Sequence, residues 1–239
     1  MLIDIEKYSQ VRLVDVCKIF TSTSFLRAQN SETNIKKPQT FIFCPNIYTP
    51  DKMNVGLIEA NGFTKGFAVI PESRVNIVYL TSILNSAVSW AVMTDGKLYE
   101  RTTITLKRLR NVLVRLLPDK EQRAVAYLYY LLMEISKQKK EGSTNPYLDF
   151  WTSIYKEVQN AIALELIMPQ AFKEYEIEML TSWLALIGKC SYENQCIDMK
   201  YLQEILGKEL LAPQNIVTGN MNKLRVVMKA MIEQTTMKI

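Results

Sequence analysis

The chain has 239 residues and a mass of 27.6 kDa, with 48% hydrophobic residues, 22% charged residues and a net charge of +5. These values are ordinary for a folded globular protein and exclude collagen-like, coiled-coil-only and intrinsically disordered chains. Histidine is absent, which excludes Ser-His and Cys-His nucleophile pairs.

Short apolar runs alternate with polar turns over the first part of the chain. Residues 11–20 are mostly apolar and β-branched and predict a strand. Residues 41–44 and 67–70 are apolar runs that each stop at a proline, and they predict buried strands. The apolar residues between positions 78 and 92 fall on one helical face, which predicts a single helix there.

The first domain is predicted to end at residue 117. Asp95 and Gly96 mark a turn after the helix, and residues 112–114 predict a last strand that leads into Pro118. Because strands and helix interleave, we expect an α+β fold with a mixed α/β domain over residues 1–117.

A long helix is predicted over residues 118–142. Acidic residues near its start and lysines near its end complement the helix dipole. Four apolar residues step along it by three, four and three positions, as in a coiled-coil seam: Val125, Leu128, Leu132 and Ile135. We expect this seam to bind a partner protein or a second copy of the chain in a homodimer. The alternative is a core helix that packs on its own domain.

Residues 143–239 are predicted to form a small all-helical domain. It begins with a small, polar linker at residues 143–146. Apolar periodicity then predicts four helices, over residues 146–168, 170–187, 199–210 and 222–234.

The spacing of the cysteines bears on metal binding, and the hydropathy pattern bears on the location of the protein in the cell. No C-x-x-C pair occurs among the four cysteines, so we expect them to be small core residues and expect no metal site. They are Cys17, Cys44, Cys190 and Cys196. No apolar run approaches the roughly 18 residues of a membrane helix, and the first ten residues lack the order of a signal peptide. We therefore expect a cytoplasmic protein with no membrane partner.

Motifs for covalent chemistry are missing from the sequence. It contains no glycine-rich phosphate loop and no G-x-S-x-G nucleophile elbow. We therefore expect that the protein is not an enzyme and holds no cofactor of its own.

Positive charge is concentrated in the first half of the chain. Residues 1–117 hold 15 lysines and arginines against 9 acids, whereas residues 141–239 hold 9 against 12. The densest group is Lys97, Arg101, Lys107, Arg108, Arg110 and Arg115. Such cations can neutralise DNA phosphates, and interspersed threonines can bind the sugar-phosphate backbone. The alternative is an ordinary solvated surface.

The run Leu-Pro-Asp-Lys-Glu-Gln at residues 117–122 follows this basic group and opens the long helix. Together with residues 104–116, it resembles the end of a target recognition domain in the specificity subunits of type I restriction-modification systems. Matching positions are Leu109, Val112, Val114, Leu117, Pro118, Glu121, Gln122 and Arg123. Residues 11–17 and 78–92 look like the opening strand and a helix of such a domain. With a single domain of this kind, the chain is similar to a half-subunit or solitary form.

The resemblance implies a non-catalytic subunit that recognises a sequence in double-stranded DNA. A separate DNA methyltransferase subunit carrying S-adenosylmethionine would then modify an adenine that is flipped out of the stack. Residues on polar loops and on the matching turn and strand are the candidates for DNA contact: Ser22, Ser24, Arg27, Lys36, Lys37, Lys97, Arg101, Thr103 and Lys107. The alternative function is an adaptor that binds another protein through its helical domain and does not bind DNA.

Overall fold

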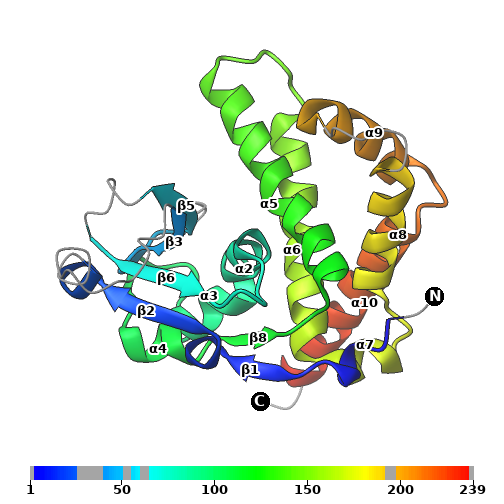
Figure 1. Ribbon diagram of the computed structural model, residues 1–239. Coiled ribbons are helices and arrows are strands. Elements are labelled where there is room, and N and C mark those ends of the chain that lie inside the picture. The colour runs from blue at the N-terminus through cyan, green and yellow to red at the C-terminus, as the bar shows by residue number, and fades with distance from the viewer. Residues whose placement is uncertain (1–2, 26–39, 51–54, 60–64, 192–197, 237–239) are drawn as a thin grey trace. The chain divides into compact units, whose positions relative to one another are not determined.

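The computed structural model describes residues 3–25, 40–50, 55–59, 65–191 and 198–236 (Figure 1). The chain divides into two compact units. The mixed unit is Tyr8–Ala126, and the helical unit combines Met1–Lys7 with Tyr127–Ile239. The division falls inside the long helix, whereas the sequence pattern placed domain boundaries at residues 117 and 142. The α+β fold class is confirmed.

The mixed unit is built on a four-stranded antiparallel sheet in the order β2-β6-β3-β5. Its strands are β2 (Cys17–Thr21), β6 (Phe67–Pro71), β3 (Thr40–Cys44) and β5 (Gly56–Glu59). The two central strands carry the buried residues Phe41, Ile42, Ala68 and Val69. The predicted strands that stop at prolines are therefore confirmed, because both runs lie in the middle of the sheet.

The described part of the mixed unit also contains two small antiparallel ladders and, between β6 and β8, three helices. The ladders pair β1 (Gln10–Arg12) with β8 (Leu113–Arg115) and β4 (Ile47–Tyr48) with β7 (Thr102–Thr103). The helices are α2 (Ile77–Leu84), α3 (Ala87–Thr94) and α4 (Leu106–Arg110). Helix α2 contacts β3, β5 and β6, and almost all of it is buried (Figure 1).

The prediction of one strand over residues 11–20 is wrong. The segment divides into β1, a 3-10 helix η2 (Leu13–Asp15) and β2, and the two strands lie in different sheets. Arg12 and Asp15 close the turn between them, because the Asp15 carboxylate accepts hydrogen bonds from the backbone N–H and the guanidinium of Arg12. The guanidinium of Arg12 also lowers the pKa of the Asp15 carboxyl.

The prediction of one helix over residues 78–92 is also wrong, since α2 and α3 meet at a bend of 66°. Ser86 begins α3, because its hydroxyl accepts a hydrogen bond from the Ser89 N–H. Asn85 ends α2 and bonds to a different part of the chain: its side-chain amide donates to the Val55 carbonyl and accepts from the Val55 N–H. A distant backbone segment thus stabilises the break.

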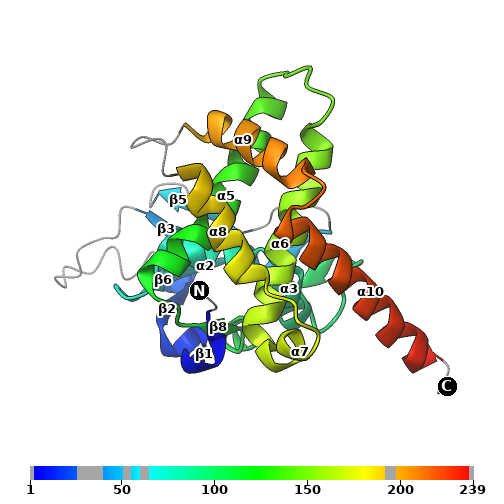
Figure 2. The ribbon, with the colours of Figure 1, turned by 90° about the vertical axis from the view of Figure 1, so that its right-hand side faces the viewer.

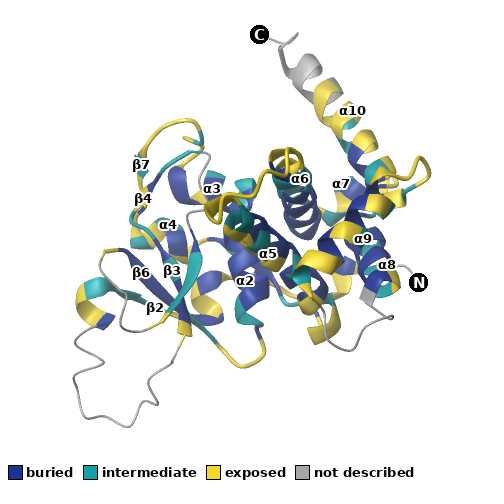
Figure 3. Ribbon diagram, turned by 90° about the horizontal axis from the view of Figure 1, so that it is seen from above, coloured by how far each residue is buried: buried dark blue, intermediate teal, exposed yellow. Residues whose placement is uncertain are grey.

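The helical unit contains the later part of α5 (Asp119–Lys140) and five more helices. They are α6 (Leu148–Ile167), α7 (Pro169–Glu174), α8 (Met179–Ser191), α9 (Met199–Leu211) and α10 (Ile216–Thr236); a 3-10 turn, η1 (Ile5–Lys7), joins them. Helix α8 contacts α6, α9 and α10, and its Trp183 is completely buried in the unit. Figure 2 shows the later half of α10 extending away from α6 and α8, and its exposed residues are yellow in Figure 3.

Two further helix predictions need correction. Residues 170–187 form α7 and α8, separated by a turn in which Glu176 has a positive φ of 52°. Helix α10 begins at Ile216 rather than at 222, because the Asn215 carboxamide accepts a hydrogen bond from the Thr218 N–H and caps the helix. The predicted extents of α5, α6 and α9 agree with the observed helices within two residues.

The seam on α5 does not form a free binding face. Val125, Leu128, Leu132 and Ile135 are at most 3% exposed within the single chain. The later half of α5 lies against neighbouring helices, since Lys139 bonds to Asp149 on α6 and Gln138 bonds to Gln203 on α9. The seam is therefore covered within the chain, which agrees with the alternative of a core helix and not with an open binding face.

The cysteines that the structure describes, Cys17, Cys44 and Cys190, are buried free thiols, and Cys196 lies outside the described residues. Burial raises the pKa of both Cys17 and Cys44 to about 12, so these thiols stay protonated at neutral pH. Among the described residues no single helix is long and apolar enough to cross a membrane. The bent pair α2 and α3 has the required length and apolarity only when the two helices are taken together.

Candidate nucleic-acid interface

Five of the six cations of the basic group lie on one surface segment of the mixed unit, residues 95–110, which we name the basic segment; the sixth, Arg115, ends β8. The basic segment begins where α3 ends: Asp95 adopts the left-handed conformation (φ 60°) and Gly96 follows with φ 78°. The Gly96 N–H donates to the Ala91 carbonyl at 2.8 Å, so the chain reverses sharply out of the helix. Figure 3 shows the exposed chain beside β4 and β7 in yellow.

The middle of the basic segment is fixed to the interior by Tyr48. The buried Tyr48 ring packs against Trp90 with ring centroids 4.8 Å apart, and its hydroxyl donates to the Leu98 carbonyl at 2.9 Å. The Ile104 N–H then donates to the Asn46 carbonyl beside the β4–β7 ladder. The backbone of the exposed residues between Leu98 and Ile104 is therefore held at both ends.

The end of the basic segment is helical, which the sequence did not predict. The Thr105 hydroxyl accepts a hydrogen bond from the Arg108 N–H and caps α4. Leu109 is fully buried and anchors this short helix. Lys107, expected on a turn and strand, therefore lies on a helix, and it is exposed there.

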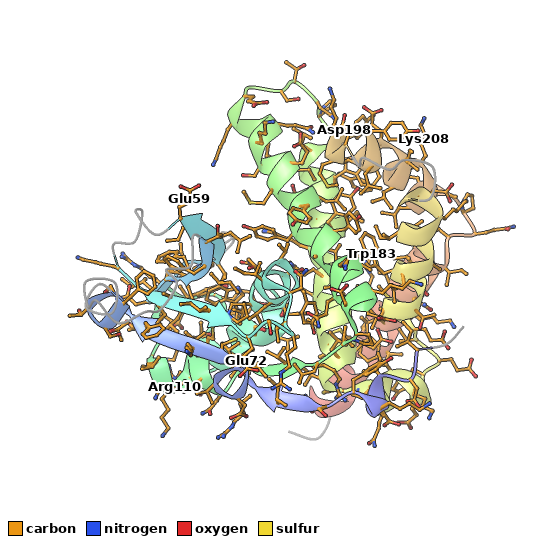
Figure 4. All side chains as sticks on the ribbon, in the orientation of Figure 1. Glu59, Glu72, Arg110, Trp183, Asp198 and Lys208 are labelled. Atoms are coloured by element: carbon orange, nitrogen blue, oxygen red, sulfur yellow. The ribbon has the colours of Figure 1, made fainter. Side chains whose placement is uncertain are left out.

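The structure separates the cations of the basic group into two kinds. Arg108 pairs with Asp95 at 2.8 Å, and the buried Arg115 donates to the Tyr8 carbonyl at 2.9 Å, so both have structural roles. The other four are exposed and have no ion-pair partner among the described residues: Lys97, Arg101, Lys107 and Arg110. The Arg110 side chain points away from the protein (Figure 4). Within the segment, Glu100 is the acid left exposed and unpaired in the described chain.

The remaining candidate residues lie elsewhere. Ser22 and Ser24 lie in a helical turn that follows β2 and is anchored by Phe25, whose ring is 4.6 Å from that of Phe41. The Ser24 hydroxyl donates to the Thr21 carbonyl, so a local bond occupies it. Arg27, Lys36 and Lys37 lie outside the described residues.

The sheet register brings the serine turn and the basic segment to one end of the sheet. Phe67 on β6 pairs with Thr21 on one side and with Cys44 on the other. Since neighbouring strands lie about 4.8 Å apart, Thr21 and Cys44 are about 10 Å apart. Ser22 follows Thr21, and Cys44 leads into β4, where Ile47 pairs with Thr103. Thr103 is exposed on β7, as its candidate role requires.

Sequence reasoning missed two exposed residues of the basic segment. Tyr99 is 95% exposed, and Arg110 is exposed on α4, yet neither was chosen as a candidate for DNA contact. Helical spacing and the Thr105 cap could have placed Arg110 outside, because Leu109 is the apolar residue of that turn. Nothing in the local pattern distinguishes an exposed Tyr99 from a buried one.

Gln122, the last residue of the Leu-Pro-x-x-Glu-Gln run, has a structural role. It is 3% exposed, and its amide donates to the carbonyls of Leu117 (2.6 Å) and Arg74 (3.0 Å). Its side-chain oxygen accepts from the Asn76 N–H at 2.6 Å. Gln122 thus joins the start of α5, the end of β8 and the chain before α2.

A separate cavity of about 300 Å³ lies in the helical unit, beside Glu165. Glu165 is 4% exposed and accepts a hydrogen bond from the Leu180 N–H at the start of α8 (2.7 Å). Burial raises its pKa to about 8, although hydrogen bonds from the Leu180 and Met179 N–H groups act in the opposite direction. The remaining acids of the cavity are Asp4, Glu6, Glu176 and Glu178, with Lys173 as its one cation among the described residues.

Among the described residues, no group of three or more histidine, cysteine, aspartate and glutamate side chains could hold a metal ion. Comparison with known proteins finds no family model, no curated protein and no solved structure that matches this chain.

Proposed function

We propose that the protein is a non-catalytic DNA-recognition subunit that acts with a separate DNA methyltransferase. One observation carries this proposal: four exposed cations without ion-pair partners in the described chain lie on one anchored segment, namely Lys97, Arg101, Lys107 and Arg110. Unpaired cations on a fixed backbone suit phosphate binding. Their contact with phosphates releases counterions from the DNA, and the backbone loses little further freedom because it is already held in place.

The charge of the two units supports the same assignment. The mixed unit holds 16 lysines and arginines against 9 acids, a net charge of +7, whereas the helical unit has a net charge of −2. A polyanion is attracted to the positive unit and not to the negative one. We therefore assign DNA binding to the mixed unit and propose that its serine turn and basic segment contact one duplex.

The resemblance to type I specificity subunits adds the methyltransferase partner. S-adenosylmethionine belongs to that partner, and the present chain would supply sequence recognition. Because the α5 seam is buried, the partner would have to bind elsewhere. The helical unit offers exposed apolar residues at Leu211, Ile216 and Val226, and we propose that the methyltransferase contacts this part of the chain.

The DNA-binding proposal predicts the effect of removing two cations. Lys97→Ala combined with Arg101→Ala should weaken binding to duplex DNA, because two phosphate contacts are lost. Fluorescence anisotropy at several salt concentrations should show the salt slope of log K falling by about 2. The matched control is Lys200→Ala with Lys208→Ala, which removes the same charge from exposed positions on α9 (Lys208 is labelled in Figure 4).

Comparison of the two double variants distinguishes a DNA-binding site on the basic segment from a general effect of net charge. If both double variants lose affinity equally, net charge and not the basic segment determines binding. If the wild-type chain does not bind duplex DNA at low salt, the proposed function is wrong.

A second function, an adaptor that binds another protein and not DNA, is favoured by a different observation. A groove of about 340 Å³ in the helical unit is lined by residues of α8, by the end of α9 and by the start of α10, including the exposed Ile216. Apolar grooves with polar rims are typical of protein-binding surfaces. The adaptor predicts no DNA binding by the wild-type chain, so the same anisotropy measurement distinguishes the two functions.

A further inference from the structure

The side chain of Tyr99 is more exposed than that of any other large hydrophobic residue in the described chain. Its exposed fraction is 95%, against 69% for Val226, the next in order. No hydrogen bond or ring contact joins the Tyr99 side chain to another described residue. An aromatic ring that is wholly in water gains no stabilisation from burial in the chain, so both of its faces are available to a ligand.

The backbone next to Tyr99 is held in place. Leu98 accepts a hydrogen bond from the Tyr48 hydroxyl, and its own N–H donates to the Gly96 carbonyl at 2.9 Å. Three residues after Tyr99, Thr102 pairs with Tyr48 in the β4–β7 ladder. Tyr48 therefore fixes the chain on both sides, and the ring projects from a short, anchored turn.

Cations flank this ring in the sequence. Lys97 precedes Tyr99 by two residues and Arg101 follows it by two, and both are exposed and unpaired in the described chain. A nucleic-acid strand presents phosphates on either side of each base, so cations that bind successive phosphates bring a base towards the residue between them. An exposed aromatic residue between two cations therefore fits a base better than it fits a protein side chain.

We propose that Tyr99 stacks against a base of the bound duplex while Lys97 and Arg101 bind the neighbouring phosphates. This inference rests on the proposed function. Stacking on a base face requires a base step of the duplex to open, and the energetic cost is smaller at a mismatch. Tyr99 would thus act at deformable base steps, in addition to the charge contacts around it.

The test compares full-length wild type, Tyr99→Ala, Tyr99→Phe and Tyr147→Ala by fluorescence anisotropy with a labelled duplex of randomised sequence. Tyr99→Ala should weaken binding about 10-fold, because stacking of one base is lost. Its salt slope should equal that of the wild type, since no charge is removed. Tyr99→Phe should bind like the wild type, because it keeps the ring. Tyr147→Ala removes a 64% exposed tyrosine from the helical unit and should have no effect.

A second measurement uses two duplexes that differ only by a central mismatch. The wild type should prefer the mismatched duplex, and Tyr99→Ala should lose that preference. If Tyr99→Ala binds both duplexes like the wild type while Lys97→Ala with Arg101→Ala is impaired, stacking is refuted and the DNA-binding function stands. An equal loss in Tyr99→Phe and Tyr99→Ala would assign the effect to the hydroxyl and also refute stacking. A wild-type chain that binds neither duplex refutes the proposed function itself.

Discussion

At the scale of single residues, Gln122 belongs to the motif that carries the family resemblance, yet its role in the structure is to hold the backbone together. The motif predicted the end of a domain. The structure explains why a glutamine suits this place: its one side-chain amide forms hydrogen bonds with two backbone carbonyls and one backbone N–H. Such groups are costly to leave without partners. Gln122 therefore has a structural role: it holds together the chain before α2, the chain after β8 and the start of α5.

Glu165 makes stability depend on pH. Its pKa is about 8 in the folded protein and near 4.5 when it is unfolded, so the folded chain holds a proton that the unfolded chain releases between these pH values. Stability should therefore fall as pH rises through this window. Glu165→Gln keeps an acceptor for the Leu180 N–H but cannot ionise. The variant should be more stable than the wild type near pH 9, by at most about 5 kcal/mol, and nearly equal to it near pH 5.

Urea unfolding followed by circular dichroism at the two pH values measures this difference. Glu204→Gln, an exposed substitution of the same kind on α9, is the control and should change neither value. A Glu165→Gln variant whose stability relative to wild type is the same at both pH values would contradict the assigned role of burial.

At the scale of elements, local signals succeeded for the two central strands and for the long helix α5, where the reason for the element lies within it. The two central strands end at prolines, and α5 carries acids at its start and lysines at its end, so both were predictable. The break between α2 and α3 was not, because Asn85 bonds to Val55, which lies 30 residues earlier. The start of α8 similarly depends on Glu165 from another helix.

The α5 seam gives the prediction at this scale. Leu128→Asp with Leu132→Asp places two carboxylates at buried positions, so it should lower the free energy of unfolding by several kcal/mol, about 3 or more for each site. Thermal unfolding measures the loss. Met133→Asp, on the exposed side of the same helix, is the control and should have little effect. Unchanged unfolding of the double variant, with loss of a bound partner, would restore the seam as an interface.

At the scale of the whole molecule, charge divides between the two units, and the proposed DNA binding follows that division. The mixed unit has the positive charge and the anchored basic segment, and the helical unit has most of the exposed large apolar residues of the described chain. This division predicts where duplex DNA protects backbone amides from hydrogen exchange. Protection should occur in residues 95–110 and in the serine turn at residues 22–25, with none in α8 or α9. Mass spectrometry of the full chain with and without DNA measures it, and protection confined to the helical unit would contradict the proposed function.

The sequence by itself determined the α+β class, the charge asymmetry, the long helix and the strands β3, β6 and β8, because composition and periodicity are local properties. It also indicated the basic group. Only the tertiary structure decided which cations are available: Arg108 and Arg115 are used by Asp95 and the Tyr8 carbonyl, whereas Lys97 and Arg101 are not paired in the described chain. Tertiary packing likewise decided that the seam is core, since a helix pattern specifies an apolar face but not which surface covers it.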